Sequence, residues 1–395
     1  MSVVVRSVVS CAVASLLGSA AIAAPYRPAS DATVLETLPA RADDPRSRSI
    51  RELRQRLAAQ PRDLDAALAL ARLYHRSVAA EGDPRYIGYA QAALAPWWDL
   101  PAPPLQVRVV RAILLQFNHH FDEALADLDA VVRAAPGNGE AWSWRAAIHM
   151  VQARYDEARA DCAKMRPLAS PLIGVACRAA IDSLTGRAAA AAQALQAMLA
   201  PGGPTAAAAD RLWALTLLGE IEARRGDPVA AEKAYREALA LGITDGYLLA
   251  AYADFLLDQQ RPREVLVLLK GMERSDLLLL RLALAAKAAG DPALAAWSAD
   301  LQARFAAAAL RGDKVHEKEE ARFALAIRGE PARALALAAS NYRLQREPAD
   351  ARVLLEAALA ARDPAAAAPA LEWMTTNGVE SVVLRGLADQ LKSLS

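Results

Sequence analysis

The stretch from Asp210 to Ala240, which reads DRLWALTLLGEIEARRGDPVAAEKAYREALA, decides the fold of this chain. At its centre stands the tripeptide Gly226-Asp227-Pro228. Glycine accepts the left-handed backbone conformation that ends a helix. Aspartate caps the next helix, and proline fits its first turn, where no backbone N–H is needed. The stretch therefore predicts two antiparallel helices joined by a tight turn.

The same turn recurs along the chain. Further copies are Gly82-Asp83-Pro84, Gly290-Asp291-Pro292, Gly329-Glu330-Pro331, Arg362-Asp363-Pro364 and, more weakly, Gln260-Arg261-Pro262. A small residue also recurs on the second helix of each pair, at Ala124, Ala158, Ala231, Val265, Ala295, Ala334 and Ala367. The step is 34 residues from Ala124 to Ala158 and from Ala231 to Val265, 33 from Ala334 to Ala367, and 30 and 39 on either side of Ala295. A period of this length predicts an array of helical repeats.

Composition agrees with an all-α fold. The chain has 395 residues, of which 54% are hydrophobic and 5% aromatic, and alanine supplies much of the apolar content. Alanine is the best helix former and a weak strand former. The 46 basic and 45 acidic residues nearly cancel, which excludes the broad positive field of a general nucleic-acid binder. The high apolar content also argues against disorder.

Residues at fixed places in the repeats resemble the tetratricopeptide repeat (TPR) family. They are Trp142, Tyr155, Ala158 and Met165 in one repeat, Leu218-Gly219, Gly226, Ala231, Tyr235 and Ala238 in another, and Phe121-Asp122-Glu123-Ala124 with Pro136 in a third. The match covers most of the stretch from Pro61 to Gly378, although the pairs around Ala191 and Ala295 lack the large aromatic residue. The resemblance implies a right-handed superhelical solenoid and, together with an export signal at the N-terminus, a secreted bacterial-type TPR protein.

The repeat length predicts about nine helix hairpins with a capping helix at each end, because a terminal repeat would otherwise expose its apolar face. The expected hairpins span residues 62–97, 104–135, 138–166, 171–200, 206–241, 245–272, 275–311, 314–344 and 348–377, and the caps are Ser49 to Ala59 and Val379 to Leu394. The predicted organisation is a signal peptide at 1–23, a loosely ordered leader at 24–47 and one solenoid at 48–395.

The first residues are typical of an export signal. Arg6 precedes an apolar core from Val8 to Leu17, and Ala21-Ile22-Ala23 fits the small-x-small rule for cleavage before Ala24. Removal of this segment leaves equal numbers of acidic and basic residues. A lipid anchor on Cys11 is the disfavoured alternative, because the apolar run before it is too short. We expect a periplasmic or secreted protein with no transmembrane span.

Export into an oxidising compartment makes the two remaining cysteines candidates for a disulfide. Cys162 and Cys177 lie 15 residues apart, on either side of the Arg166-Pro167-Leu168 turn. If each lies on one arm of a helical hairpin, their side chains can meet. The alternative is two separate buried thiols, since free cysteine behaves as a small hydrophobic residue. The sequence leaves both alternatives open.

Signatures of catalysis are scarce, and we expect a non-catalytic protein without cofactor or metal. The run His316-Glu317-Lys318-Glu319-Glu320 begins like a zinc-protease helix, but its fifth residue is not histidine. His119 and His120 stand in a turn without an acidic or thiol pair to complete a metal site, and His149 on the next hairpin is the one further candidate. His149 falls where the family has a buried aromatic residue, which favours a place in the core.

The TPR resemblance implies a partner-binding groove lined by the first helix of each hairpin. It places on that groove Glu140, Ser143, Ala147, Trp213, Thr216, Glu220, Tyr247, Ala250, Asp254, Glu319, Phe323, Arg352 and Glu356. This row mixes acids with isolated aromatics and has no basic cluster, which disfavours phosphate or nucleic-acid ligands. The expected function is to bind another protein or peptide, in envelope assembly or export.

A second group of aromatic residues allows a different function. Tyr86, Tyr89, Trp97 and Trp98 precede the rigid segment Pro101-Ala102-Pro103-Pro104, where they either bind a ligand or fill the gap beside a longer loop. The alternative function is a glycan-binding or polysaccharide-export accessory module. It would stack sugars on an exposed row formed by Trp97, Trp98, Trp142, Trp144 and Trp213.

Overall fold

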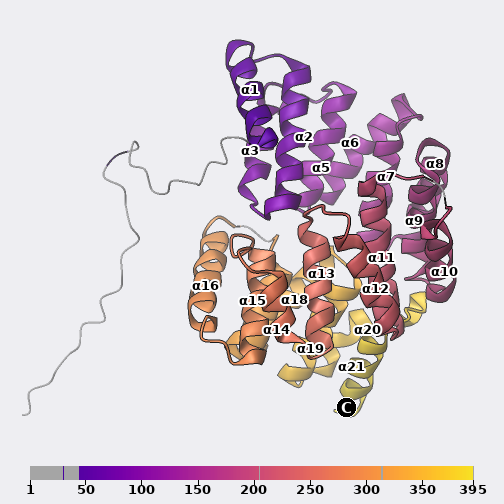
Figure 1. The fold of residues 1–395 in the computed structure, drawn as a ribbon, viewed down its shortest axis with the longest axis vertical. Coiled ribbons are helices and arrows are strands. Elements are labelled where there is room, and N and C mark those ends of the chain that lie inside the picture. Colours follow the sequence, from indigo (N-terminus) through magenta and orange to yellow (C-terminus); the bar gives the residue numbers. More distant parts are fainter. Residues whose placement is uncertain (1–29, 31–43, 204, 313–314, 395) are drawn as a thin grey trace, which may run out of the picture. The chain divides into compact units, whose positions relative to one another are not determined.

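A computed structural model describes Ser30 and residues 44–203, 205–312 and 315–394. The predicted signal peptide at 1–23 lies outside the described residues, as does most of the predicted leader at 24–47. The chain divides into the units Met1–Arg48 and Ser49–Ser395, and the helical repeats lie in the second unit. The described part contains 21 α-helices and no strand (Figure 1).

Nine helix pairs follow one another along the described chain. They are α2 (Leu64–Glu81) with α3 (Arg85–Ala93), α5 (Leu105–Phe117) with α6 (Phe121–Ala134), α7 (Gly139–Val151) with α8 (Tyr155–Met165), α9 (Pro171–Asp182) with α10 (Ala188–Leu199), α11 (Ala208–Arg225) with α12 (Pro228–Leu239), α13 (Gly246–Asp258) with α14 (Pro262–Leu268), α15 (Asp276–Ala289) with α16 (Leu294–Leu310), α17 (Glu317–Phe323) with α18 (Pro331–Leu344), and α19 (Pro348–Ala361) with α20 (Ala368–Asn377). The predicted all-α, TPR-like solenoid of nine hairpins is confirmed.

Short elements complete the array. They are α4 (Ala95–Trp98), the 3-10 turns Arg166–Leu168 and Pro364–Ala367, and a π-turn at Ala324–Arg328. The two predicted capping helices are present as α1 (Pro45–Ala59) and α21 (Val382–Lys392). Ile50, Leu53 and Leu57 of α1 pack against the core of the first hairpin. None of the described helices has the length and apolarity needed to cross a membrane.

The turns inside the hairpins have the predicted backbone. Gly226 adopts a φ of 86°, and the Asp227 carboxylate accepts a hydrogen bond from the Ala230 N–H at 2.9 Å. Four hairpins make the same left-handed turn without glycine, at His119, Ala153, Gln260 and Arg362. A non-glycine residue in this conformation costs about 1–2 kcal/mol, so these turns depend on the packing around them.

The small residue of each second helix lies where two hairpins approach. Ala124, Ala158, Ala231, Val265, Ala334 and Ala367 have no exposed surface. Ala295 is the exception, because it is exposed at the start of α16, which is buried instead through Leu301 and Phe305. In the fifth hairpin, a Cβ on Gly219 would lie 2.7 Å from the Tyr235 ring. Only glycine therefore fits between α11 and α12 at that level.

The solenoid winds back on itself, so that hairpins far apart in sequence touch. Helix α2 contacts α13 (Figure 1). The Arg346 N–H donates to the Val151 carbonyl at 2.7 Å, and the Trp373 indole N–H donates to the Tyr155 hydroxyl at 3.0 Å. In the last two contacts, residues at the turn inside the third hairpin meet the loop before α19 and helix α20. The later repeats thus rest on the edge of the earlier ones.

Candidate functional site

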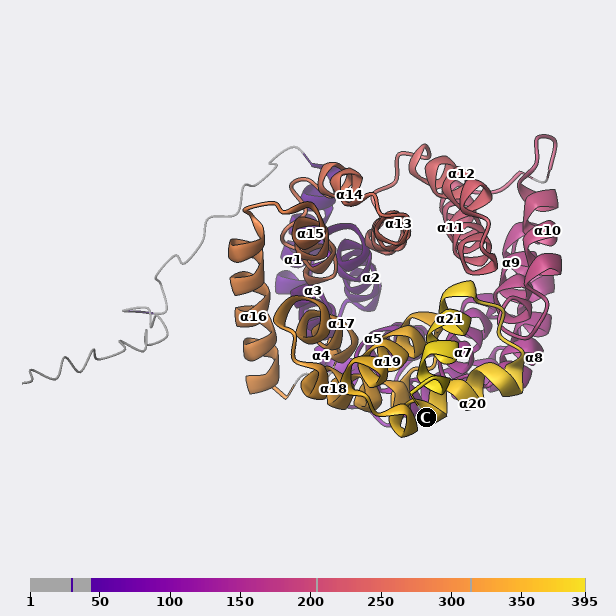
Figure 2. The same ribbon diagram turned by 90° about the horizontal axis from the view of Figure 1, so that it is seen from below.

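The first helices of the last five hairpins surround a cavity of about 180 Å³. Figure 2 shows α11, α13, α17 and α19 gathered around the middle of the solenoid, with α21 against them. We call this surface the groove. Its lining residues are Glu220, Ala223, Arg224, Tyr235, Ala251, Asp254, Phe255, Asp258, Arg281, Lys318, Arg322, Pro348, Ala349, Arg352, Val353, Ser381, Val383 and Leu384.

Asp254 of α13 is the centre of the charge network in the groove. It accepts a hydrogen bond from Arg281 at 2.7 Å and two from Arg322 at 3.0 Å. Burial alone would raise the pKa of Asp254, but the two guanidinium groups outweigh it and hold the pKa well below its usual range. The shared carboxylate therefore links three successive hairpins, through α13, α15 and α17.

The other cations of the network are also paired with carboxylates. Arg352 of α19 donates two hydrogen bonds to Asp258, at 2.7 and 2.8 Å, and one to Glu356 at 2.7 Å. The Lys318 ammonium lies 3.6 Å from an Asp350 oxygen, and burial is outweighed there by the nearby carboxylates, which raise the pKa of Lys318. These pairs fix the first helices relative to one another, and they leave few free cations.

Two carboxylates in this region lack a basic partner. The Tyr247 hydroxyl donates to Glu220 at 2.7 Å, and Glu347 accepts from the backbone N–H of Asp350 in a capping box at the start of α19. Among the described residues, neither glutamate forms an ion pair with lysine or arginine. Burial raises the pKa of Glu220. Burial, together with the nearby Asp350 carboxylate, raises the pKa of Glu347 to about 7.

Exposed aromatic rings lie on α11 and α13, two of the helices that line the cavity. Tyr247 is 58% exposed and Trp213 is 38% exposed. Trp213 and Glu220 are seven residues apart on α11, which places them on one face of the helix about 10 Å apart. Large exposed rings on a concave surface are typical of a binding site.

The structure brings together part of the predicted groove. Glu220, Asp254 and Arg352 line the cavity, Tyr247 bonds to Glu220, and Glu356 bonds to Arg352. Glu319 is buried and lies 3.9 Å from Arg281. The three predicted residues of α7 lie elsewhere: Glu140 pairs with Arg72 at 2.8 Å, Ser143 is exposed and Ala147 is half-buried.

Three residues expected on the groove belong to the core instead. Thr216 is 3% exposed and its hydroxyl donates to the Leu212 carbonyl, while Ala250 is 4% exposed. Phe323 is 4% exposed, and its ring packs against Phe305. The family pattern assigned too wide a face to each first helix. Neighbouring first helices, such as α11 and α13, pack against one another and cover the flanks of that face.

The sequence pattern did not place on the groove four residues that line it, Arg224, Arg281, Lys318 and Arg322, or Glu347, which directly precedes the lining residue Pro348. Arg281 carried a usable signal, because it is a lone charge in the apolar run from Leu277 to Ala286. A buried charge needs a partner, which here is Asp254. Glu347 gave no comparable signal, because it stands before α19 rather than on it.

The second aromatic group mostly fills the core. Tyr86, Trp97 and Trp98 are half-buried and pack against the cluster of the first hairpin, and only Tyr89 is exposed, at 53%. Of the five tryptophans considered for glycan stacking, only Trp213 is exposed. The Trp142 indole donates to the Pro136 carbonyl at 2.8 Å. The described tryptophans therefore form no exposed row.

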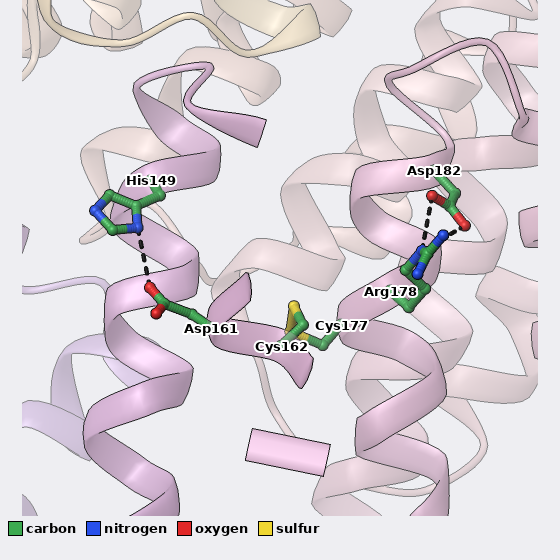
Figure 3. The surroundings of a disulfide bond; sticks show 6 residues. All are labelled: His149, Asp161, Cys162, Cys177, Arg178 and Asp182. Carbon is green, nitrogen blue, oxygen red and sulfur yellow. Dashed lines mark hydrogen bonds and ion pairs between the residues drawn. A yellow bond between two sulfur atoms is a disulfide. The ribbon is translucent and has the colours of Figure 1, made fainter. Parts of the chain in front are cut away.

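Two of the candidate histidines make contacts that support the fold. His149 is 4% exposed, and its Nδ1 lies 3.0 Å from an Asp161 oxygen, which confirms its expected place in the core (Figure 3). His119 contacts Gln345 of the later repeats, and burial lowers the pKa of His119 to about 4. Within the described ranges, no three histidine, cysteine or acidic residues gather in a way that would hold a metal ion.

Cys162 and Cys177 form a disulfide, with their Cα atoms 5.8 Å apart (Figure 3). The bridge joins α8 to α9, so it links the second helix of one hairpin to the first helix of the next. The two cysteines thus lie on the helices on either side of the Arg166–Leu168 turn, as the disulfide alternative required. At the level of the two cysteines, α8 and α9 lie close enough to form the bond.

Comparison with known proteins yields structural likeness alone. No family model and no curated protein matches the sequence. A chain of the Cut9–Hcn1 hetero-tetramer of the APC/C is 12% identical with a TM-score of 0.43, covering 87% of this chain and 58% of that one. The P58(IPK) TPR domain is 14% identical with a TM-score of 0.22, covering 88% and 98%.

A chain of the Naa15/Naa10 complex bound to HypK-THB is 14% identical with a TM-score of 0.25, covering 89% of this chain and 64% of that one. The present chain thus spans less than two thirds of two of these three structures. Its TPR-like architecture stands on its own hairpins, turns and buried small residues.

Proposed function

We propose that this protein is an exported, non-catalytic scaffold that binds a partner protein or peptide through the groove. The observation that carries the proposal is the pair of exposed rings, Trp213 on α11 and Tyr247 on α13, two of the five first helices that line the cavity. Exposed aromatic side chains contribute more binding energy than other residues when a partner covers them. The surrounding ion pairs hold these helices in place, which lowers the entropic cost of binding.

Photocrosslinking tests the groove directly. A photoreactive phenylalanine at Tyr247 should capture one protein partner in cells, because this side chain is 58% exposed and is held by the lining residue Glu220. The matched control is the same residue at Val229, which is 79% exposed on α12, the second helix of its hairpin. Equal capture at both positions, or none at Tyr247 in the native host, would contradict the proposal.

Export is a separate part of the proposal and rests on the residues before Ala24. Intact mass of the purified mature protein should correspond to a chain that begins at Ala24. Cell fractionation should place it outside the cytoplasm. Recovery of the full-length chain from the cytoplasm would contradict export. It would not affect the proposal that the groove binds a partner.

A further inference from the structure

Most cations in the groove are paired with carboxylates, whereas two carboxylates in this region have no lysine or arginine partner among the described residues. Asp254 is shared by Arg281 and Arg322, and Arg352 is held by two carboxylates. Each of these cations is already engaged, so an anionic ligand would have to displace an internal carboxylate to reach it. The unmatched carboxylates, by contrast, are open to a new partner.

Glu220 and Glu347 are these unmatched groups. Glu347 directly precedes Pro348 and Ala349, which line the same cavity as Glu220. Arg224 is the one nearby cation without a carboxylate partner among the described residues, and it donates to the Ser183 hydroxyl at 2.9 Å. Two carboxylates against one unpaired guanidinium leave this end of the groove acidic.

Tyr247 adds a second feature that favours a cation. Its hydroxyl is held by Glu220 at 2.7 Å, while 58% of the residue stays exposed. A cation over an aromatic face is attracted by the ring quadrupole, and a neighbouring carboxylate strengthens the same preference. The ring and the Glu220 carboxylate are therefore fixed together as one recognition surface.

We infer that the partner presents a lysine or arginine side chain to Tyr247, Glu220 and Glu347. This inference rests on the proposed function of the groove and names the chemistry of the partner. An acidic segment would add charge of the same sign beside Glu220 and Glu347. A purely apolar segment would displace water from both carboxylates without offering a hydrogen bond or a positive charge in its place. This desolvation would make binding less favourable.

Trp213 sets the length of the recognised segment. It lies about 10 Å from Glu220 along α11, and an extended chain advances about 3.3 Å per residue. A basic side chain at Tyr247 thus places a residue about three positions away over the Trp213 ring. The expected motif is a basic residue and an apolar residue separated by two others.

The test uses a short probe peptide and its neutral twin. A fluorescein-labelled peptide with arginine three positions from leucine is titrated with the mature protein, and fluorescence anisotropy gives Kd. In the twin, citrulline replaces arginine, which keeps the shape and removes the charge. We expect the arginine peptide to bind about tenfold more tightly, with an affinity that falls as salt rises.

Variants assign the effect to the groove. Glu220→Gln should weaken the arginine peptide about tenfold and leave the citrulline peptide unchanged. Tyr247→Phe should retain most binding because the ring remains, whereas Tyr247→Ala should lose it. The control Glu237→Gln changes an exposed glutamate on α12 and should have no effect. Circular dichroism and Tm establish that each variant is folded.

Either of two results would overturn the inference. One is equal binding of both peptides, and the other is no binding of the arginine peptide at millimolar concentration. Photocrosslinking at Tyr247 separates this failure from that of the proposed function. A captured partner together with equal peptide affinities would leave the groove as a binding site and reject only its preference for a cation.

Discussion

The Trp373 indole N–H donates a hydrogen bond to the Tyr155 hydroxyl at 3.0 Å, across 218 residues of sequence. Both side chains are buried, Trp373 in α20 and Tyr155 at the start of α8. Burial raises the pKa of Tyr155 to about 12. The bond therefore joins the last hairpin to the third one at a point that water does not reach.

Removing this bond should destabilise the whole solenoid. Tyr155→Phe keeps the ring but leaves the buried Trp373 N–H without its acceptor, which should lower the free energy of unfolding by about 1–3 kcal/mol. Urea denaturation measures the change. Tyr89→Phe, at a residue 53% exposed, should stay within about 0.5 kcal/mol. Equal effects of the two variants would show that the Tyr155 bond contributes nothing.

A matched pair of glycines tests the contact between early and late repeats. Gly82 and Gly290 both end a first helix, with φ of 67° and 69°. A Cβ at Gly82 would lie 2.1 Å from the Ser275 side-chain oxygen, whereas at Gly290 it would meet nothing within 4 Å. Alanine should cost about 1–2 kcal/mol at Gly290 and a further 1–3 kcal/mol or so at Gly82.

Differential scanning calorimetry of the two variants gives this comparison. The expected order is wild type, then Gly290→Ala, then Gly82→Ala, from the highest Tm to the lowest. If Gly290→Ala proves as damaging as Gly82→Ala, the contact with Ser275 does not constrain the fold.

Reduction of the disulfide should lower stability without changing the fold. The bridge closes a loop of 15 residues, worth about 3 kcal/mol in the chain-entropy model. Thermal unfolding with and without a phosphine reductant measures the effect, and intact mass confirms the redox state. The double variant Cys162→Ala/Cys177→Ala should have the same Tm as the reduced protein, and the reductant should not change that Tm. A reductant effect on that variant would point to another cause.

The charge network in the groove predicts a large cost for Asp254→Asn. Arg281 is 5% exposed, so loss of the carboxylate would strand a buried guanidinium. We expect a loss of about 3 kcal/mol, at the low end for buried pairs because the Asp254 side chain is 26% exposed. Asp389→Asn, in an exposed pair with Lys392, should change stability little. Chemical denaturation distinguishes the two.

Glu347 predicts a pH dependence of stability. Its pKa is raised from 4.5 to about 7 in the folded protein, so the native state holds this proton more tightly than the unfolded chain. The stabilisation from this group is fully present below pH 4.5 and is lost as the pH rises through about 7. The difference in free energy of unfolding between wild type and Glu347→Gln should change across this window, by up to about 1.4 kcal/mol per pH unit.

His119 changes the free energy of unfolding with pH in the direction opposite to Glu347. For this reason the prediction concerns the difference between wild type and Glu347→Gln. Its pKa is lowered from 6.5 to about 4, so its stabilisation is present above pH 6.5 and is lost as the pH falls toward 4. Denaturation curves of wild type alone would show the two effects partly cancelled. A pH-independent difference between wild type and Glu347→Gln would contradict the assignment to Glu347.

The hairpins were predictable because their signals are local. Gly226, Asp227 and Pro228 specify a turn within three residues, and each copy of that turn marks a boundary. The contact of Gly82 with Ser275 has no such signal, because neither residue's neighbours encode a partner in a distant repeat. Sequence patterns therefore predicted the solenoid of helix hairpins. They did not predict the contacts between its later and its earlier repeats.

The groove was predictable only in part for a related reason. Tyr247 and Asp254 stand at the family's groove positions and do face the cavity or its rim. Thr216 stands at such a position as well, yet the packing of adjacent first helices buries it. Which side of each helix stays open depends on the angle between neighbouring hairpins. That angle follows from side-chain packing, which a repeat pattern does not specify.

The return of the last repeats onto the first has a mechanical consequence. In a solenoid whose repeats contact only their neighbours, the repeats at each end can unfold independently of the rest. Such an array can also be extended along its axis without breaking contacts between distant repeats. Here the chain beyond residue 340 is fastened to the third hairpin at Val151 and Tyr155. Separating these elements breaks contacts in the third hairpin and in the last repeats at once, so we expect the repeats to unfold together and the solenoid to resist extension.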